Sequence, residues 1–186
     1  MARPRAADYD TQRDRILTRA VEAFARTGYA AASMSMLAAA CKVSKATLYH
    51  YMQDKHQLLV QICETHVQAL AALVAAQQAE SASQGLSASA HLQGLILRFM
   101  VAYGQAQHEH RVLTEEVKFL LPQDHERLKH IERGVVQAFA QAVAAVRPDL
   151  SGQRLHKPLT MLLFGMINWM FTWFRPGEPL THEQMA

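Results

Sequence analysis

The stretch that decides the fold spans residues 33–51 and reads SMSMLAAACKVSKATLYHY. It predicts two short helices separated by a tight break at Cys41-Lys42-Val43. Ser44 is expected to cap the second helix, because a serine hydroxyl can accept hydrogen bonds from backbone N–H groups of the following turn. Leu48 would face inward, and the exposed remainder of this helix offers short donors and a small side chain. Such a surface fits the major groove of DNA, so the stretch predicts a helix-turn-helix motif.

A family resemblance rests on the same residues. The run 43–51, VSKATLYHY, together with Asp54-Lys55 and Leu58-Leu59, resembles the DNA-binding domain of the TetR family of bacterial transcriptional regulators. The lead-in agrees in order and spacing through Ile16-Leu17, Ala20, Phe24, Gly28-Tyr29 and Ser33.

One position departs from the family pattern. Lys42 stands where the family most often has glycine. Glycine reaches positive φ freely and lysine does not, so the turn is expected to be strained or differently shaped.

The composition favours an all-α protein. Half of the 186 residues are apolar, and only 8 Gly and 6 Pro are present. No alternation of β-branched and polar residues and no Asn-Gly or Asp-Gly turn predicts a β-hairpin. The sequence therefore predicts a three-helix helix-turn-helix domain over residues 1–55 and a helical ligand-binding and dimerisation domain over residues 56–186.

Further helices are expected at the ranges where apolar residues recur every three or four positions. They cover residues 10–27, 54–79, 87–107, 111–121, 122–146 and 154–175, with a flexible connector at 81–85 and a stop at 147–149. The last helix is apolar nearly all round, so it is expected to be buried on both sides.

Charge and composition also indicate where the protein acts. Residues 1–60 contain nine Lys and Arg against five Asp and Glu, whereas residues 61–186 contain ten against eleven. A basic module on a near-neutral body is typical of a protein that binds duplex DNA. Arg3 and Arg5 lie in a segment, 1–7, that is expected to form a loose basic arm.

The remaining features favour a cytoplasmic protein without a membrane partner. Cys41 and Cys63 have no CxxC spacing and are expected to be reduced thiols. Residues 1–14 lack the apolar core of a signal peptide. The apolar run 159–174 has 16 residues, fewer than the roughly 20 that a membrane-spanning helix needs.

Candidate DNA contacts divide into base readers and phosphate ligands. Lys45 is expected to read guanine, Ala46 to meet a thymine methyl group, and His50 to do either. Hydroxyl groups of Thr47, Tyr49 and Tyr51 can donate to phosphates, although Tyr51 could equally be part of the core. The predicted DNA-binding set is Ser33, Ser35, Ser44, Lys45, Ala46, Thr47, Tyr49, His50, Tyr51 and Lys55.

Three members of that set have a specific basis. Lys55 would combine its ammonium group with the N-terminal N–H groups of the next helix to hold a phosphate. By analogy with the family, Ser33 and Ser35 would lie at the start of the first helix of the motif, where it abuts the DNA backbone.

A homodimer on a pseudo-palindromic operator is also expected. One recognition helix buries little surface, and helix-turn-helix proteins usually pair across two half-sites. The apolar stripe over 128–146 and the helix over 159–174 resemble the two C-terminal helices that form a four-helix dimer interface in TetR-like proteins.

The helical body is expected to bind a small effector. An amide at Asn168, inside an apolar run, needs a hydrogen-bond partner when it is buried. The predicted ligand-binding residues are Phe99, Tyr103, His110, Arg111, Phe119, Phe164, Asn168 and Trp169.

The effector class comes from a second, shorter resemblance. The segments 163–169 and 173–176 resemble the C-terminal part of a TetR subgroup that responds to acyl-CoA thioesters. This resemblance implies an acyl- or aryl-CoA effector and no other cofactor. A metal-responsive or hydrophobic-drug-responsive repressor is the alternative.

An enzyme is not expected. His108 and His110 are two residues apart and would point to different sides of a helix, unlike the i, i+4 pair of a zinc helix. The sequence has no glycine-rich phosphate loop and no nucleophile elbow, so no catalytic residues and no metal ligands are predicted.

Overall fold

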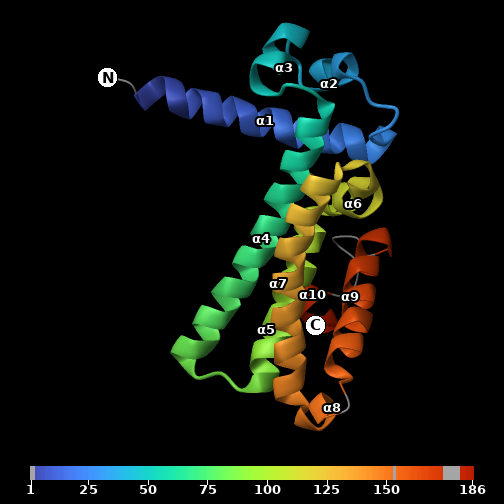
Figure 1. Cartoon of the computed structure of the whole chain (residues 1–186). Coiled ribbons are helices and arrows are strands. Elements are labelled where there is room, and N and C mark those ends of the chain that lie inside the picture. The colour runs from blue at the N-terminus through green and yellow to red at the C-terminus, as the bar shows by residue number, and fades with distance from the viewer. Residues whose placement is uncertain (1–2, 153, 174–180) are drawn as a thin grey trace. The chain divides into compact units, whose positions relative to one another are not determined.

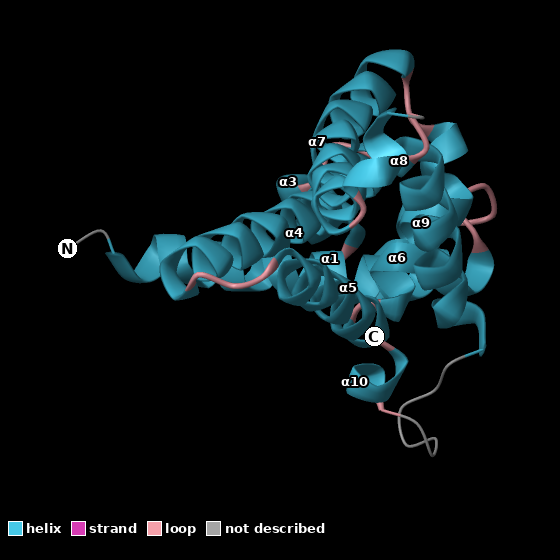
Figure 2. Cartoon of the chain, turned by 90° about the horizontal axis from the view of Figure 1, so that it is seen from below, coloured by secondary structure: helices cyan, strands magenta, loops and turns pink. Residues whose placement is uncertain are grey.

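The computed structural model describes residues 3–152, 154–173 and 181–186, with the backbone alone at 3–8, 151–152, 171 and 182–183. All regular structure in these ranges is helical (Figure 2), as the sequence predicts. The chain forms two compact units. The head unit comprises Met1–His66 and His108–His125, and the body unit comprises Val67–Gln107 and Glu126–Ala186.

The head unit contains the helix-turn-helix. Helix α2 (Met34–Ala40) packs against α1 (Arg3–Thr27) and against α3 (Lys45–Tyr51), as Figure 1 shows. The first turns of α4 (Lys55–Gln84), then α6 (Gln107–Glu116), the short 3-10 helix η1 (Val117–Phe119) and the start of α7 (Pro122–Val146) complete the unit. Its fully buried apolar side chains include Ile16, Ala20, Phe24, Leu37, Leu48, Leu58 and Leu59.

The body unit has a continuous apolar core. It is built by α4, α5 (Ala88–Gln105), α7 and α9 (His156–Trp173), with α8 (Pro148–Gly152) and α10 (His182–Met185) as short additions. Phe99 of α5 lies at its centre, with ring centroids 4.8 Å from Phe139 and 6.1 Å from Phe164. Both α9 and α10 pack against α5 (Figure 2).

A buried polar network joins α4 to α5 in the body unit. Arg98 donates its Nε–H to Gln77 Oε1 at 2.6 Å and forms an ion pair with Glu80. The Gln77 amide donates in turn to Ser81 Oγ at 3.2 Å. This amide lies directly over Gly94, where an added Cβ would be 2.5 Å from Gln77 Nε2. The network therefore requires glycine at position 94.

The observed helix ends agree with the predicted ones in some places and differ in others. Helix α7 has the predicted bounds, Pro122–Val146. The predicted connector at 81–85 is wrong in part, because α4 continues to Gln84 and ends at Gly85, whose φ is +62°. Within this longer helix the Ser81 hydroxyl lies 2.7 Å from His91 Nδ1, a partner on α5 that the local sequence does not reveal.

Among the described helices, α4 alone is long and apolar enough to cross a membrane, by length and composition only. Of its most apolar 18-residue stretch, 44% is buried inside the structure. Its buried apolar residues belong to the cores of the two units.

Candidate functional site

Serine caps fix both helices of the motif. Ser33 Oγ accepts a hydrogen bond from the backbone N–H of Met36 at 3.2 Å, and Ser44 Oγ accepts one from Thr47 at 3.0 Å. The Ser44 cap is the one predicted from the sequence. Ser44 Oγ also lies 2.8 Å from Thr47 Oγ1, so these two hydroxyl groups hold the start of α3 together.

The turn between α2 and α3 is a Schellman motif. Val43 donates its N–H to the Ala38 carbonyl at 3.0 Å, and Lys42 donates to the Ala39 carbonyl at 3.1 Å. Lys42 has φ +57°, so of the two expected outcomes, a strained turn or a differently shaped one, the structure shows a lysine in the left-handed conformation. These two bonds satisfy carbonyls that the end of α2 would otherwise leave without donors.

The motif presents one face of α3 to solvent. Lys45, Ala46, Tyr49 and His50 are exposed, and Leu48 is fully buried beneath them. The Lys45 ammonium lies 5.9 Å from the centre of the Tyr49 ring, one turn further along the helix. Ser35 on α2 is also exposed. Cations, hydroxyl groups and a small side chain thus stand together, the composition expected of a surface that enters a DNA groove.

Lys55 occupies a different place from the one predicted for a phosphate ligand. Its ammonium donates to the carbonyls of Tyr29 and Ala32, both at 2.9 Å, and lies 4.3 Å from the centre of the Tyr29 ring. These contacts turn the charge toward the loop between α1 and α2. In this structure Lys55 closes that loop.

An aromatic contact that sequence reasoning missed braces the end of α3. The ring of Tyr9, on α1, stacks on Tyr51 with centroids 4.6 Å apart and meets His50 edge-on at 6.0 Å. Tyr51 is half-buried as a result. The prediction of a loose arm over residues 1–7 is wrong from Arg3 onward, because α1 begins there. The side chains of Arg3 and Arg5 lie outside the described residues.

Helix α6 is part of the head unit, which the sequence did not indicate. His110 of α6 approaches His66 of α4, with Nδ1 and Nε2 3.5 Å apart. Burial lowers the pKa of His66 to about 4, and burial with the neighbouring His66 lowers the pKa of His110 to about 3. Both imidazoles are therefore neutral at neutral pH.

Two more contacts tie the segment after α6 to the head unit. His56 Nε2 lies 2.8 Å from Asp124 Oδ2, and the Phe119 ring lies 5.1 Å from that of Tyr29. The only sequence signal for these pairs is the aromatic and charged character of their members.

The eight predicted ligand residues are divided between the units. His110, Arg111 and Phe119 belong to the head unit, where Arg111 pairs with Glu115 at 3.1 Å. Phe99, Tyr103 and Phe164 are packed in the body core, and burial raises the pKa of Tyr103. Asn168 and Trp169 lie on α9, where Asn168 Oδ1 is buried and accepts no hydrogen bond from the described residues.

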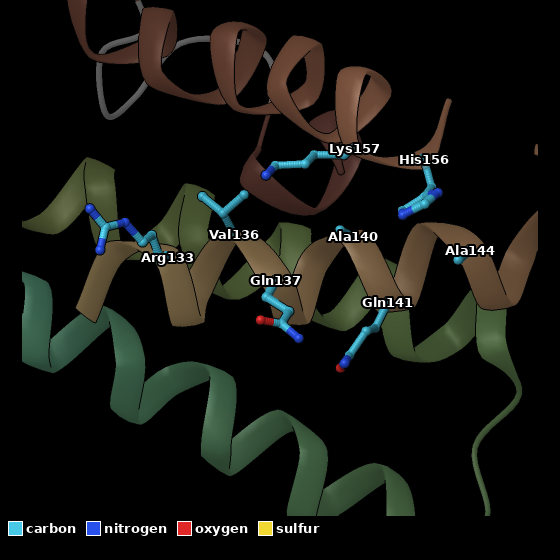
Figure 3. Close-up of a pocket in the computed structure, with 8 residues that line it drawn as sticks. All are labelled: Arg133, Val136, Gln137, Ala140, Gln141, Ala144, His156 and Lys157. Atoms are coloured by element: carbon cyan, nitrogen blue, oxygen red, sulfur yellow. The ribbon is translucent and has the colours of Figure 1, made fainter. Parts of the chain in front are cut away.

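A cavity of about 490 Å³ lies in the body unit, between α7 and the start of α9 (Figure 3). Arg133, His156 and Lys157 supply cations or potential cations, and no carboxylate is among its lining residues in the described chain. The other lining residues are Val136, Gln137, Ala140, Gln141 and Ala144. None of the eight predicted ligand residues contributes to it.

Two family models match the chain. The model described as bacterial regulatory proteins, tetR family, matches residues 16–62. The model described as tetracyclin repressor-like, C-terminal domain, matches residues 85–186, more than half of the chain. The chain belongs to the TetR family. A comparison with curated proteins found no match.

Solved structures agree with the TetR assignment. A TetR-family transcriptional regulator from Bordetella parapertussis 12822 is 29% identical, with a TM-score of 0.87 over 93% of this chain and 88% of that one. AibR, solved with isovaleryl coenzyme A and operator DNA, is 24% identical, with a TM-score of 0.75 over 94% and 93%. The ketosteroid transcriptional regulator KstR2 of Mycobacterium tuberculosis is 19% identical, with a TM-score of 0.80 over 93% and 88%. The last two likenesses show the fold alone.

TetR membership makes this chain a DNA-binding transcriptional regulator. The DNA-binding model spans the two serine caps, the Schellman turn and α3. Among the described residues, no group of three or more His, Cys, Asp or Glu side chains is placed to hold a metal ion.

Proposed function

We propose that the protein is a homodimeric transcriptional repressor that binds a pseudo-palindromic operator through α3 and is released by an acyl- or aryl-CoA thioester. The observation that carries DNA binding is the exposed face of Lys45, Ala46, Tyr49 and His50, held on a capped helix in a TetR module. This proposal places the protein in the cytoplasm, with the DNA.

The surface of α9 supports the homodimer. Leu162, Met166 and Trp169 are 65%, 66% and 67% exposed, although they are large and apolar. With Leu155, Leu159 and Trp173 they recur at intervals of four and three residues, the spacing of a helix that packs against another helix. A row of exposed apolar residues of this size on one helix indicates a protein partner. If that partner is a second copy of this chain, the dimer has the two recognition helices that the two half-sites of a pseudo-palindromic operator require.

The cavity of the body unit supports an anionic thioester. Val136, Ala140 and Ala144 provide apolar wall for an acyl group, and Lys157 can meet a phosphate (Figure 3). Arg133 is held in an exposed ion pair with Glu126 at 3.1 Å, so it would have to share or exchange that partner to meet a second phosphate. His156 Nδ1 is buried without a hydrogen-bond partner among the described residues, so it has capacity for a ligand. The AibR structure with isovaleryl coenzyme A gives a precedent in this fold.

The proposed mechanism is a shift between two populations. Helices α4 and α7 each run through both units, so a ligand bound to the body can bias the position of the head. If only one spacing of the two α3 helices matches the operator, a ligand that prefers another conformer lowers the affinity for DNA.

The test is fluorescence anisotropy of the full-length protein on labelled DNA from upstream of its own gene, with and without a panel of acyl-CoA thioesters. We expect tight, salt-sensitive binding that one thioester reverses. Binding that no thioester changes would favour a metal or a hydrophobic drug as effector. An absence of binding, there and on a wider operator screen, would contradict the proposed DNA-binding role.

A further inference from the structure

We infer that Lys42, in the turn of the helix-turn-helix, is an additional contact to a DNA phosphate. The inference rests on the proposed DNA-binding function. Lys42 lies between α2 and α3, on neither helix of the motif, and its backbone conformation is unusual for lysine.

The conformation at Lys42 is unfavourable for lysine. Its φ of +57° lies in the left-handed region, where the Cβ of an L-residue crowds the backbone and glycine has no such penalty. The Schellman hydrogen bonds from Lys42 and Val43 hold the backbone there. A glycine at position 42 would make the same two bonds with less strain.

Nothing in the described head unit offsets that strain through the Lys42 side chain. The residue is exposed, and no ion pair or hydrogen bond of its ammonium is found among the described residues. The sequence contains no Asp or Glu from residue 23 to residue 53, so the motif itself offers no carboxylate. Within the described residues, no partner occupies the charge of Lys42.

The nature of the proposed partner follows from the position of the turn. Lys42 precedes Lys45, the exposed cation at the start of α3, by three residues. When a recognition helix enters the major groove, the segments beside it face the sugar-phosphate backbone. A lysine in the turn, outside the helix that reads the bases, has a flexible stem and a compact charge that can reach a phosphate. Strained residues concentrate at functional sites, in agreement with this role.

Three proteins test the inference: wild type, Lys42→Gly and Lys42→Arg. The glycine variant loses strain and charge together, so we expect a higher melting temperature but weaker binding, by about five- to tenfold at 0.1 M salt. Because the contact is to a phosphate, the loss should be the same on operator DNA and on an unrelated duplex. The slope of log K against log salt should also become shallower by about one. Lys42→Arg keeps the charge and should keep the wild-type slope.

The alternatives are distinguishable in the same experiment. A glycine variant that is more stable and binds both duplexes with the wild-type affinity and salt slope overturns the inference, leaving Lys42 as a tolerated substitution. A loss confined to the operator would indicate base recognition and also overturn it. Wild-type protein that binds no duplex at low salt contradicts the proposed function itself, and this inference with it.

Discussion

Ser44 and Lys45 are neighbours in the sequence but have different tasks in the structure. The Ser44 hydroxyl is bonded to the backbone and hydroxyl of Thr47, so it stabilises α3. Lys45 is exposed, and its one described contact is the ring of Tyr49. Substitutions at the two positions should therefore change different measurable quantities.

Lys45→Ala should weaken operator binding by about 1–3 kcal/mol, roughly 5- to 150-fold, and relax specificity at one base position. The melting temperature should change little, because alanine is a good helix former at an exposed site. Ser44→Ala is the matched comparison and should lower stability by about 0.5–2 kcal/mol through the lost cap. Anisotropy titrations and thermal melts of both variants measure these effects. Operator affinity of Lys45→Ala within about twofold of wild type would remove Lys45 from the list of base readers.

Residue-level reasoning from the sequence succeeded where the cause is local. The Ser44 cap and the break after α2 depend on neighbours within a few positions, so the sequence predicted both, although it left open whether the turn at Lys42 would be strained or differently shaped. The contacts of Lys55 were missed, because its carbonyl partners lie 23 to 26 residues earlier in the chain. The pair of Tyr9 with Tyr51 and that of His66 with His110 were missed for the same reason.

At the scale of elements, α4 and α5 are joined by a polar network that leaves no space for a side chain at position 94. Gln77 is almost fully buried, and Arg98 and Ser81 hold its amide over Gly94. The amide is the end of a flexible side chain, yet it cannot move aside without losing these hydrogen bonds. A buried network that is partly broken leaves polar groups unsatisfied.

Gly94→Ala should therefore destabilise the protein by about 1–3 kcal/mol, as overpacking of a filled site does. Gly134→Ala is the control, because no atom lies within 4 Å of a Cβ at that exposed position of α7. It should stabilise the protein by about 0.5–1 kcal/mol, since alanine favours a helix more than glycine does. Thermal melts at equal protein concentration report both. Shifts of the same sign would show that Gln77 yields freely.

Where α6 packs against α4, two buried histidines should make the stability of the protein depend on pH. The folded-state pKa values of His66 and His110, about 4 and about 3, lie below the ordinary value of 6.5. The unfolded chain therefore binds protons first as pH falls, and stability is fully present above pH 6.5 and lost below it.

Between pH 6.5 and pH 5, one such histidine accounts for a loss of about 2 kcal/mol in the free energy of unfolding. Wild-type protein should thus lose about that much more stability over this range than His66→Gln does, as measured by urea unfolding at the two pH values. His108→Gln alters an exposed histidine and should behave like wild type. Equal losses in wild type and His66→Gln would show that His66 is not held neutral by burial.

The whole molecule raises the question of how two recognition helices come together. The predicted domains, 1–55 and 56–186, are each continuous in the sequence. The compact units are not, because the head unit includes residues 108–125 from the middle of the chain. Sequence periodicity shows that a helix has an apolar face but not which helix covers it. This limit applies to α6, whose apolar face is covered in the head unit, and to α9, whose row of large apolar side chains is exposed in the part of the chain that the structure describes.

Trp169→Glu tests whether a second copy of the chain covers α9. Trp169 is 67% exposed and lies in the row of large apolar residues, so a charge there should leave the fold intact and prevent another helix from packing. Size-exclusion chromatography with light scattering should show a dimer for wild type and a monomer for the variant. Affinity for a two-half-site operator should fall by about 100-fold or more, because two linked binding modules gain that factor from their second contact. Leu121→Glu, at an exposed apolar position of the head unit, should remain dimeric and controls for the added charge. A Trp169→Glu protein that stays dimeric with the wild-type affinity would show that the pairing surface lies elsewhere on the molecule.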